Sequence, residues 1–250
     1  MKRIIFSIFL LATVVNGFAQ QSIKDSTITM GLLNVSYRGL FPGGDLYERF
    51  GFNSQMGIDM TVKFKNNFYL TAGGHVLFSD VVKDTSIMSN ILTNGLLITD
   101  NGLLSSVRTI QSGFVIPLSV GKVFPLPVGP NKNSGVFVEV GGQFIQHRVG
   151  IRALDEVVTP VSEEYRKGYD RLANGIGIRE SIGYLFLANH SGLNFSVALD
   201  FSQNFTQGRR SIQFDTGLPG LEKRRDFLTG IRVSWIFPLY NRAPDKIYYN

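Results

Sequence analysis

The sequence predicts an all-β protein, a closed antiparallel barrel of eight membrane-spanning strands with short periplasmic turns and long outer loops. Three observations predict it. The chain opens like an exported protein, eight later segments alternate apolar and polar residues, and the connections between those segments alternate in length. Strands of about ten residues, joined by short turns and long loops in alternation, are typical of outer-membrane barrels.

The N-terminus has the features of a cleavable signal peptide. Lys2 and Arg3 form a basic start, and the apolar run that follows over 4–15 is short for a membrane-spanning helix. Gly17 and Ala19 are small residues at the spacing that signal peptidase needs, so we expect cleavage after Ala19. The alternative is an N-terminal membrane anchor.

We expect four parts: the signal peptide (1–19), a short periplasmic segment (20–27), the barrel (28–237) and a periplasmic tail (238–250). The chain contains no cysteine, which excludes disulfides and thiol catalysis. Its formal net charge falls from +6 to +4 when the two basic leader residues are removed, and this excess is too small to indicate a nucleic-acid partner.

Eight segments have the alternation of a strand whose two faces differ. From Leu193 to Phe201 every second residue is apolar, and polar or small residues such as Asp200 lie between them. Successive side chains of a strand point to opposite sides, so each segment has one apolar and one polar face. In chain order the segments are 33–41, 55–64, 68–78, 113–122, 136–144, 175–186, 193–202 and 226–237.

Aromatic residues at the strand ends indicate which face contacts lipid. A soluble sandwich would show the same alternation, but phenylalanines bracket three of the apolar faces, as in the aromatic girdles at the two membrane interfaces. These pairs are Phe68 and Phe78, Phe195 and Phe205, and Phe227 and Phe237. The apolar faces are therefore predicted to contact lipid, and the polar faces to line the lumen.

The connections alternate between short and long. Ten strands are an alternative if 80–110 contains a hairpin, but we expect a short helix and a loop there. With both termini periplasmic, the alternating short turns and long loops must connect an even number of strands, and eight strands satisfy this. The short connections are 65–67, 124–134 and 188–192, and the long ones are 42–53, 80–110, 150–171 and 207–224.

Two residues depart from the pattern. Glu180 falls on an apolar face, so we expect a β-bulge or a position near the rim. Pro117 removes a ladder donor in the middle of a strand, so we expect a bulge or a mispaired position there.

Seven charged side chains are predicted to point into the lumen. An eight-stranded barrel has an interior just filled by side chains, and charges in so narrow a space need partners. We therefore expect a salt-bridged plug, with a narrow polar pore as the alternative. The seven residues are Arg38, Asp59, Lys63, Glu139, Arg179, Asp200 and Arg232.

The first outer loop is predicted to fold over the barrel mouth. Asp45 is placed to cap a single helical turn by accepting hydrogen bonds from backbone N–H groups of that turn. Leu46 and Phe50 lie four residues apart and share a face, so we expect them to pack into the mouth while Glu48 and Arg49 stay in solvent. The alternative to this lid is an exposed knob that recognises a partner barrel.

Basic residues gather in the last long loop and at its base. Beside an anionic outer leaflet, cations at this height are suited to contact lipid phosphates, and the alternative is a solvated loop. The residues are Arg209, Arg210, Lys223, Arg224 and Arg225.

No motif in the chain indicates a catalytic or metal site, and no cofactor is predicted. His75 and His147 approach the outer ends of strands that are not neighbours, and His190 lies in a predicted periplasmic turn. The enzyme alternative, a lipid-modifying barrel, requires a histidine, a serine and an acid within reach of one another at one rim.

The C-terminal tail follows the expected terminal aromatic residue, Phe237. Tyr240, Tyr248 and Tyr249 are side chains typical of interfaces, so we expect the tail either to fold against the periplasmic mouth or to dock a partner.

The stretches FPGGDLYERFG (41–51), QHR (146–148), KGYDRL (167–172) and WIFPLYNR (235–242) resemble small outer-membrane barrels of bacteroidete-type bacteria, the broad OmpA-like or PorT-like group. The resemblance implies an eight-stranded barrel without enzymatic activity, in some members an accessory subunit of secretion or assembly machinery. OmpA carries a peptidoglycan-binding domain after its barrel. Only 238–250 follow here, so that function is not implied.

Three functions remain open at this point. They are an accessory or structural subunit of an envelope complex, a narrow solute pore and a lipid-modifying enzyme. We favour the first, because the predicted lumen charges can pair with one another and no catalytic constellation forms. Outer-membrane lipid is an expected partner, with other envelope proteins reached through the outer loops or the tail.

Overall fold

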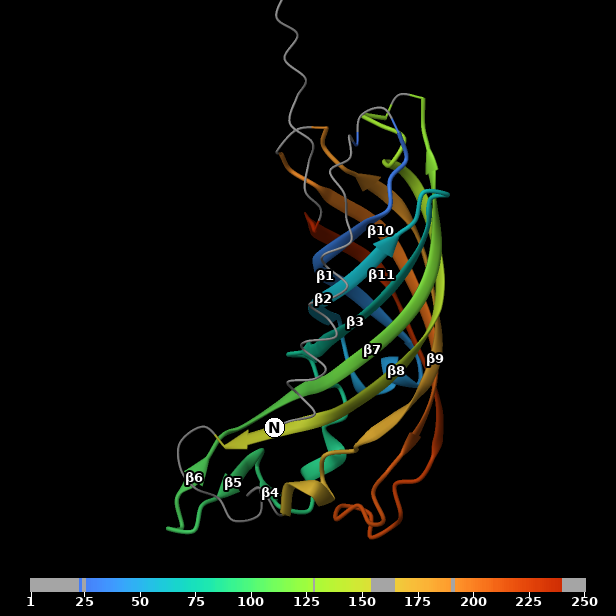
Figure 1. The fold of residues 1–250 in the computed structure, drawn as a ribbon. Helices are drawn as coiled ribbons and strands as arrows, with labels where there is room; N and C mark the ends of the chain where they lie inside the picture. Colours follow the sequence, from blue (N-terminus) through green and yellow to red (C-terminus); the bar gives the residue numbers. More distant parts are fainter. Residues whose placement is uncertain (1–22, 24–25, 128, 154–164, 190–191, 240–250) are drawn as a thin grey trace, which may run out of the picture.

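The computed structural model describes residues 23, 26–127, 129–153, 165–189 and 192–239. Eight long strands close into an antiparallel barrel in the order β1-β11-β10-β9-β8-β7-β3-β2, with β2 paired to β1 (Figure 1). The predicted eight-stranded barrel is confirmed. Its strands are β1 (Met30–Gly44), β2 (Asn53–Lys63), β3 (Phe68–Ser79), β7 (Val107–Pro125), β8 (Gly135–Ala153), β9 (Ala173–Phe186), β10 (Phe195–Gly208) and β11 (Lys223–Pro238).

The remaining elements lie outside the barrel wall. The segment predicted as one short helix and a loop contains a single 3-10 turn and a separate three-stranded sheet, so the barrel has eight strands and the ten-strand alternative is wrong. No helix in the described part of the chain is long and apolar enough to cross a bilayer. These elements are α2 (Asp45–Arg49), η1 (Ser86–Met88), β4 (Leu92–Thr93), β5 (Leu96–Ile98), β6 (Leu104–Ser105) and η3 (Tyr165–Gly168).

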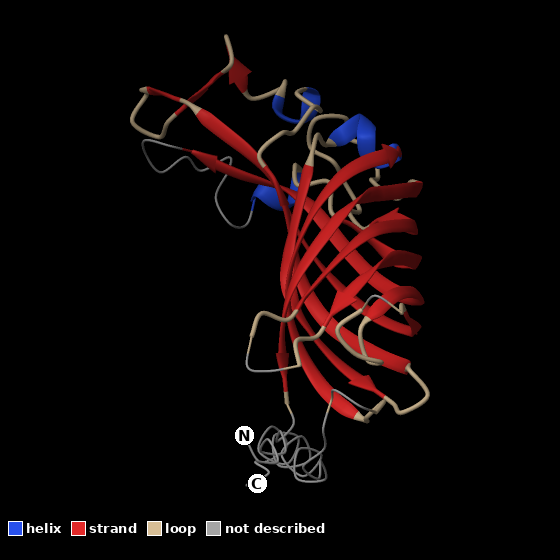
Figure 2. Ribbon diagram, turned by 90° about the horizontal axis from the view of Figure 1, so that it is seen from above, coloured by secondary structure: helices blue, strands red, loops and turns tan. Residues whose placement is uncertain are grey.

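The two ends of the barrel differ, as the connection lengths predict. The helical turns of the described residues gather at one end, which we call the long-loop end (Figure 2). The opposite, short-turn end holds the turns between β2 and β3, β7 and β8, and β9 and β10. β1 begins and β11 ends at this short-turn end, where Leu32 pairs with Pro238.

The strands are longer than the ten or so residues expected. β7 and β8 have 19 residues each and project beyond the other strands at the long-loop end (Figure 1). Alternation identified the part of each strand with one apolar face, but ladder pairing continues past it: Val107 pairs with Ala153.

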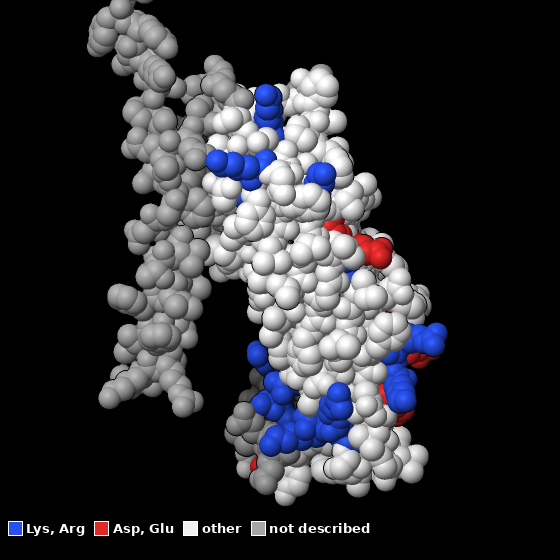
Figure 3. All heavy atoms as spheres, turned by 45° about the vertical axis from the view of Figure 1, so that its right-hand side comes forward, with Lys and Arg blue, Asp and Glu red and all other residues white. Residues whose placement is uncertain are grey.

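The wall is apolar outside and polar inside. Val76, Leu199 and Ile231 point outward and are 54–60% exposed, whereas Arg38 and Asp200 point inward and are at most 5% exposed. Figure 3 shows a broad belt that is largely uncharged, with the larger group of basic side chains near the long-loop end. This arrangement is the reverse of a water-soluble barrel and suits strands whose outer faces contact lipid.

The β3–β7 ladder is interrupted beside Pro117. Pairing runs as far as Ala72 with Leu118 and resumes in the same register at His75 with Val115. The proline therefore occupies a mispaired position, one of the two arrangements predicted, and no residue is inserted.

Glu180 does not mark a bulge or the rim, and that prediction is wrong. Both ladders of β9 run in unbroken register through it, pairing it with Val140 on one side and Phe201 on the other. Its side chain is exposed on the outer face of the barrel. Regular pairing keeps the period of two, so the carboxylate must point outward with its apolar neighbours.

Candidate functional site

One polar side chain from each of the eight barrel strands meets in the middle of the lumen. We call this set the lumen network. Alternation directs all of these residues inward, and the tilt of the strands brings them to one region. Its members, in chain order from β1 to β11, are Arg38, Asp59, His75, Ser119, Glu139, Arg179, Asp200 and Arg232.

Asp200 is the centre of the network. Its carboxylate lies 2.8 Å from Nε of Arg38, 3.3 Å from Nε of Arg232 and 3.8 Å from Nη2 of Arg179. All four side chains are at most 6% exposed. Three guanidinium groups from three different strands therefore share one carboxylate.

Two further carboxylates complete the charge balance. Glu139 lies 3.4 Å from Arg179 and 3.5 Å from Arg232, and Asp59 lies 3.5 Å from Arg38. Three guanidinium groups thus face three carboxylates, and each guanidinium contacts two of them. Buried charges avoid their large desolvation cost only when they are paired in this way.

The sequence placed His75 toward the outer end of its strand, but its side chain lies in the middle of the lumen as part of the lumen network. Its Nε2 lies 2.9 Å from Oδ1 of Asp59. The signal available was the inward position of His75 in the alternation; the contact itself depends on the pairing of β2 with β3.

Lys63 points inward as predicted but lies apart from the lumen network. Its Nζ donates to Oδ1 of Asn133, at 2.9 Å, near the short-turn end. The same oxygen accepts from the backbone N–H of Ile28, and the amide nitrogen of Asn133 donates to the carbonyls of Ile23 and Ser26. Asn133 therefore ties the N-terminal segment across this end of the lumen.

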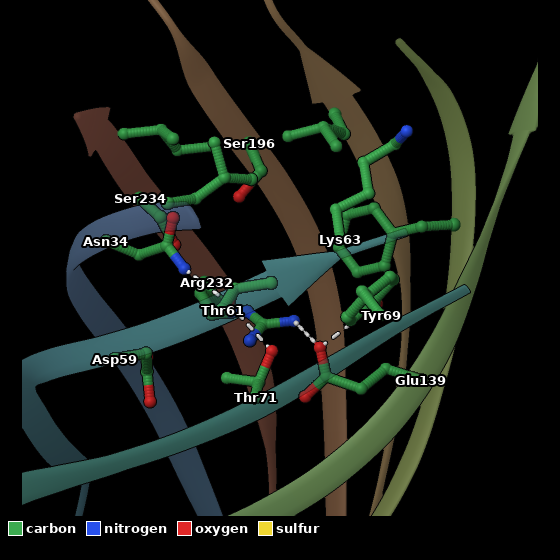
Figure 4. Close-up of a pocket in the computed structure, with 14 residues that line it drawn as sticks. Asn34, Asp59, Thr61, Lys63, Tyr69, Thr71, Glu139, Ser196, Arg232 and Ser234 are labelled. Atoms are coloured by element: carbon green, nitrogen blue, oxygen red, sulfur yellow. Dashed lines mark hydrogen bonds and ion pairs between the residues drawn. The ribbon is translucent and has the colours of Figure 1, made fainter. Parts of the chain in front are cut away.

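A small cavity of about 50 Å³ lies between that closure and the lumen network. Figure 4 shows Tyr69 and Arg232 directed at Glu139 on one side of it; their hydrogen bonds to Oε2 are 3.2 and 3.5 Å long. Asn34 and Thr61 are hydrogen-bonded to each other on another side. A cavity of this size holds a few water molecules, not a solute path.

A second polar layer lies on the long-loop side of the lumen network. His147 and Asp226, both fully buried, approach to 3.0 Å through Nε2 and Oδ2. Thr206 donates to the same Oδ2, and Asn204 donates to the backbone carbonyl of Asp226. The Phe50 ring packs against His147 in a T-shaped arrangement, with ring centres 5.7 Å apart.

The first long loop closes the barrel mouth. Leu46 and Phe50 are fully buried in an apolar cluster with residues of the wall, including Leu77, Val115 and Ile145. This is the packing that the lid hypothesis requires. The exposed-knob alternative requires these two side chains to face solvent, and they do not.

Two details of the lid differ from the prediction. Asp45 makes no capping hydrogen bond to its own helix; its Oδ2 accepts from the backbone N–H of Arg225, 2.6 Å away on β11. Arg49 is buried instead of solvated and donates to the carbonyl of Arg171. Burial and the nearby cations Arg224 and Arg171 lower the pKa of Arg49 to about 10. Glu48 is exposed, as expected.

The basic residues of the last loop divide into two groups. Arg210 is paired with both carboxylate oxygens of Asp170, and these hydrogen bonds raise its pKa. Arg224 points inward, toward Asp226 and the backbone carbonyl of Asp45. The other three, Arg209, Lys223 and Arg225, are exposed.

The exposed cations border a hollow on the outside of the barrel. It has a volume of about 560 Å³, and its lining includes Arg209, Lys223 and Arg225 above the apolar side chains Phe205 and Ile176. Figure 3 shows basic side chains gathered toward the same end of the molecule. A phosphate above an acyl chain has the same order of charged and apolar parts.

Several predicted features lie outside the described residues. They are the signal peptide, His190 and the tail tyrosines Tyr240, Tyr248 and Tyr249. In the part of the chain that the structure describes, no three His, Asp or Glu side chains are grouped to hold a metal ion.

No family model and no curated protein matches the chain. Three solved structures that resemble it are Ail, the attachment invasion locus protein of Yersinia pestis; Neisserial surface protein A; and the N-terminal β-barrel domain of Pseudomonas aeruginosa OprF. The sequence identities are 7%, 10% and 10%, and the TM-scores are 0.42, 0.43 and 0.39. The alignments cover 84%, 83% and 84% of this chain and 99%, 97% and 99% of the others.

Proposed function

We propose that this chain is a non-enzymatic outer-membrane barrel with a closed lumen, which serves as an accessory or structural subunit of an envelope secretion or assembly complex. The observation that carries the proposal is the lumen network. Polar side chains from all eight strands, with three cations balanced by three anions, fill the centre, and both ends are closed, by Asn133 at one and by Leu46 and Phe50 at the other. A barrel that has no solute path through its lumen can act only through its surfaces.

The pore alternative receives less support from the same geometry. A conducting lumen needs a continuous wet path, and here the cavity beside the lumen network is about 50 Å³. The enzyme alternative rests on His147 and Asp226, which are fully buried beneath Phe50. A lipid substrate has no route to that pair.

A planar-bilayer recording tests the closed lumen. We expect the purified, refolded chain to give no regular unitary steps at neutral pH, while a porin in the same bilayer does. Regular steps from the wild-type chain would refute the closed barrel and favour the pore.

Lipid phosphates are the second proposed partner. Arg209, Lys223 and Arg225 are exposed cations above an apolar hollow, and they suit a phosphorylated glycolipid at the outer surface. Replacing all three with Gln should lower co-purified glycolipid phosphate at least threefold. The matched control replaces Lys65 and Lys132, exposed lysines at the opposite end, and should leave it unchanged. Equal loss in both variants would contradict the assignment.

A further inference from the structure

Glu180 places a carboxylate on the outer face of the barrel, inside the apolar belt. On β9 it lies between the outward-facing Ile178 and Ile182, which are both 53% exposed. Its ladder neighbours are Val140 on β8 and Phe201 on β10. β9 runs from Ala173 to Phe186, so Glu180 lies near the middle of its strand. The carboxylate is therefore level with acyl chains, not headgroups.

Nothing in the described barrel compensates this charge. Glu180 forms no hydrogen bond or ion pair with any described residue, and Arg179, next to it in sequence, points into the lumen. None of the described outward side chains over 136–144 of β8 and 195–205 of β10 is basic. Acyl chains supply neither hydrogen bonds nor counter-charge, so ionisable groups at such positions usually have a function.

A hollow of about 570 Å³ lies beside the carboxylate. It forms because Thr229, a small residue, stands between Phe41 on β1 and Phe201 on β10. The outward side chains that line the hollow are apolar apart from Glu180 and Thr229. A shaped apolar surface with one acid inside it is typical of a binding face more than of a lipid-facing wall.

We propose that the face around Glu180 docks a membrane-embedded surface of a partner protein that carries a basic side chain, Lys or Arg, which pairs with the carboxylate while apolar side chains fill the hollow. The inference rests on the proposed function as a subunit of a complex. Charge complementarity selects this occupant. An acyl chain would fill the hollow and leave the acid unpaired, lipid ammonium groups lie at headgroup height, and the same face of a second copy would bring another carboxylate.

Site-specific crosslinking in native membranes tests the proposal. A photoreactive phenylalanine analogue replaces Ile182 beside the acid or, as a matched control, Ile58 on β2, which lies four strands away on the opposite side of the ring. We expect Ile182 alone to give a protein adduct whose crosslinked segment contains Lys or Arg, and the adduct yield to fall at least fivefold with Glu180→Leu. Reversing the charges, with Glu180→Lys and an acid on the partner, should restore it.

Three outcomes would overturn the inference. They are an adduct that is indifferent to Glu180→Leu, an adduct only with a second copy of this chain, and adducts with lipid alone. A stability control separates docking from folding. In vesicles without the partner, Glu180→Leu should raise the folding equilibrium constant several-fold, and a decrease would mean that Glu180 serves the fold. The crosslinking test is independent of the closed lumen, because Glu180→Leu changes only the outer face. Channel activity of the wild-type barrel would therefore refute the closed lumen but leave the crosslinking result unaffected.

Discussion

Replacing Asp200 with Asn should destabilise the barrel more than any other single isosteric change in the lumen network. The substitution removes the charge from a hydrogen bond with Arg38 at 2.8 Å and from ion pairs with Arg232 at 3.3 Å and Arg179 at 3.8 Å. A hydrogen bond to a charged group is worth about 1.5–3 kcal/mol. The guanidinium groups keep their second carboxylates, Asp59 and Glu139, which places the expected loss near the lower end of the range for a broken buried pair, about 3 kcal/mol.

A second substitution should restore part of the lost free energy of unfolding. Asp200→Asn combined with Arg232→Met leaves two complete pairs, Arg38 with Asp59 at 3.5 Å and Arg179 with Glu139 at 3.4 Å. The lumen network is then balanced again, two cations against two anions. We expect a coupling free energy of about 1–2 kcal/mol between the two sites, within the usual range for contacting residues.

The assay is reversible urea unfolding of the refolded barrel in lipid vesicles, followed by tryptophan fluorescence and by the mobility shift on boiling. Asp80→Asn is the control, because its pair with Arg108 is exposed to solvent and should change stability by at most about 0.5 kcal/mol. A loss below about 1 kcal/mol for Asp200→Asn, or strict additivity in the double variant, would refute the idea that the lumen is a dry, charge-balanced plug.

Three further predictions concern the closures and the wall, measured by the same unfolding assay. Phe50→Ala should lower the unfolding free energy by about 3–5 kcal/mol because the ring is fully buried in the lid, whereas Tyr47→Ala, on the exposed side of the same turn, should change it little. Asn133→Ala should cost roughly 2–4 kcal/mol, since it removes four hydrogen bonds at the short-turn end, and an unchanged stability would contradict its role as a tie. Gly73→Ala should cost about 1–3 kcal/mol because its Cβ would overlap a carboxylate oxygen on β2, while Gly74→Ala meets nothing within 4 Å and should be neutral; equal effects would reject the overlap.

The sequence predicts the direction of nearly every barrel side chain but not its height or partner. A period of two is a property of the strand itself, so Arg38 and Glu139 could be assigned to the lumen from local pattern alone. Lys63 satisfies the same pattern yet lies by Asn133, because height depends on strand tilt and on the pairing register, which involve residues far apart in the chain. The contact of His75 with Asp59 could not be predicted from the sequence for the same reason.

The lid shows the same limit in a loop. The spacing of Leu46 and Phe50 predicts a shared apolar face, and both are buried. The prediction for Asp45 failed because a local cap competed with a hydrogen-bond donor from β11, 180 residues later. Arg49 is buried by contact with the carbonyl of Arg171. Short-range patterns therefore predicted what packs locally, and long-range contacts decided the polar groups.

The lumen network also accounts for why this register is the one that forms. A slip of one residue in any strand turns every side chain of that strand to the other face. For β10 such a slip would move Asp200 into lipid and leave Arg38 and Arg232 each with a single carboxylate. Six of the eight strands contribute a charged member, so a similar penalty applies to a slip in any of those six. Among the described acids of the barrel strands, Glu180 is the exception that the correct register leaves in the apolar belt, and the proposed contact with a partner gives this exception a reason.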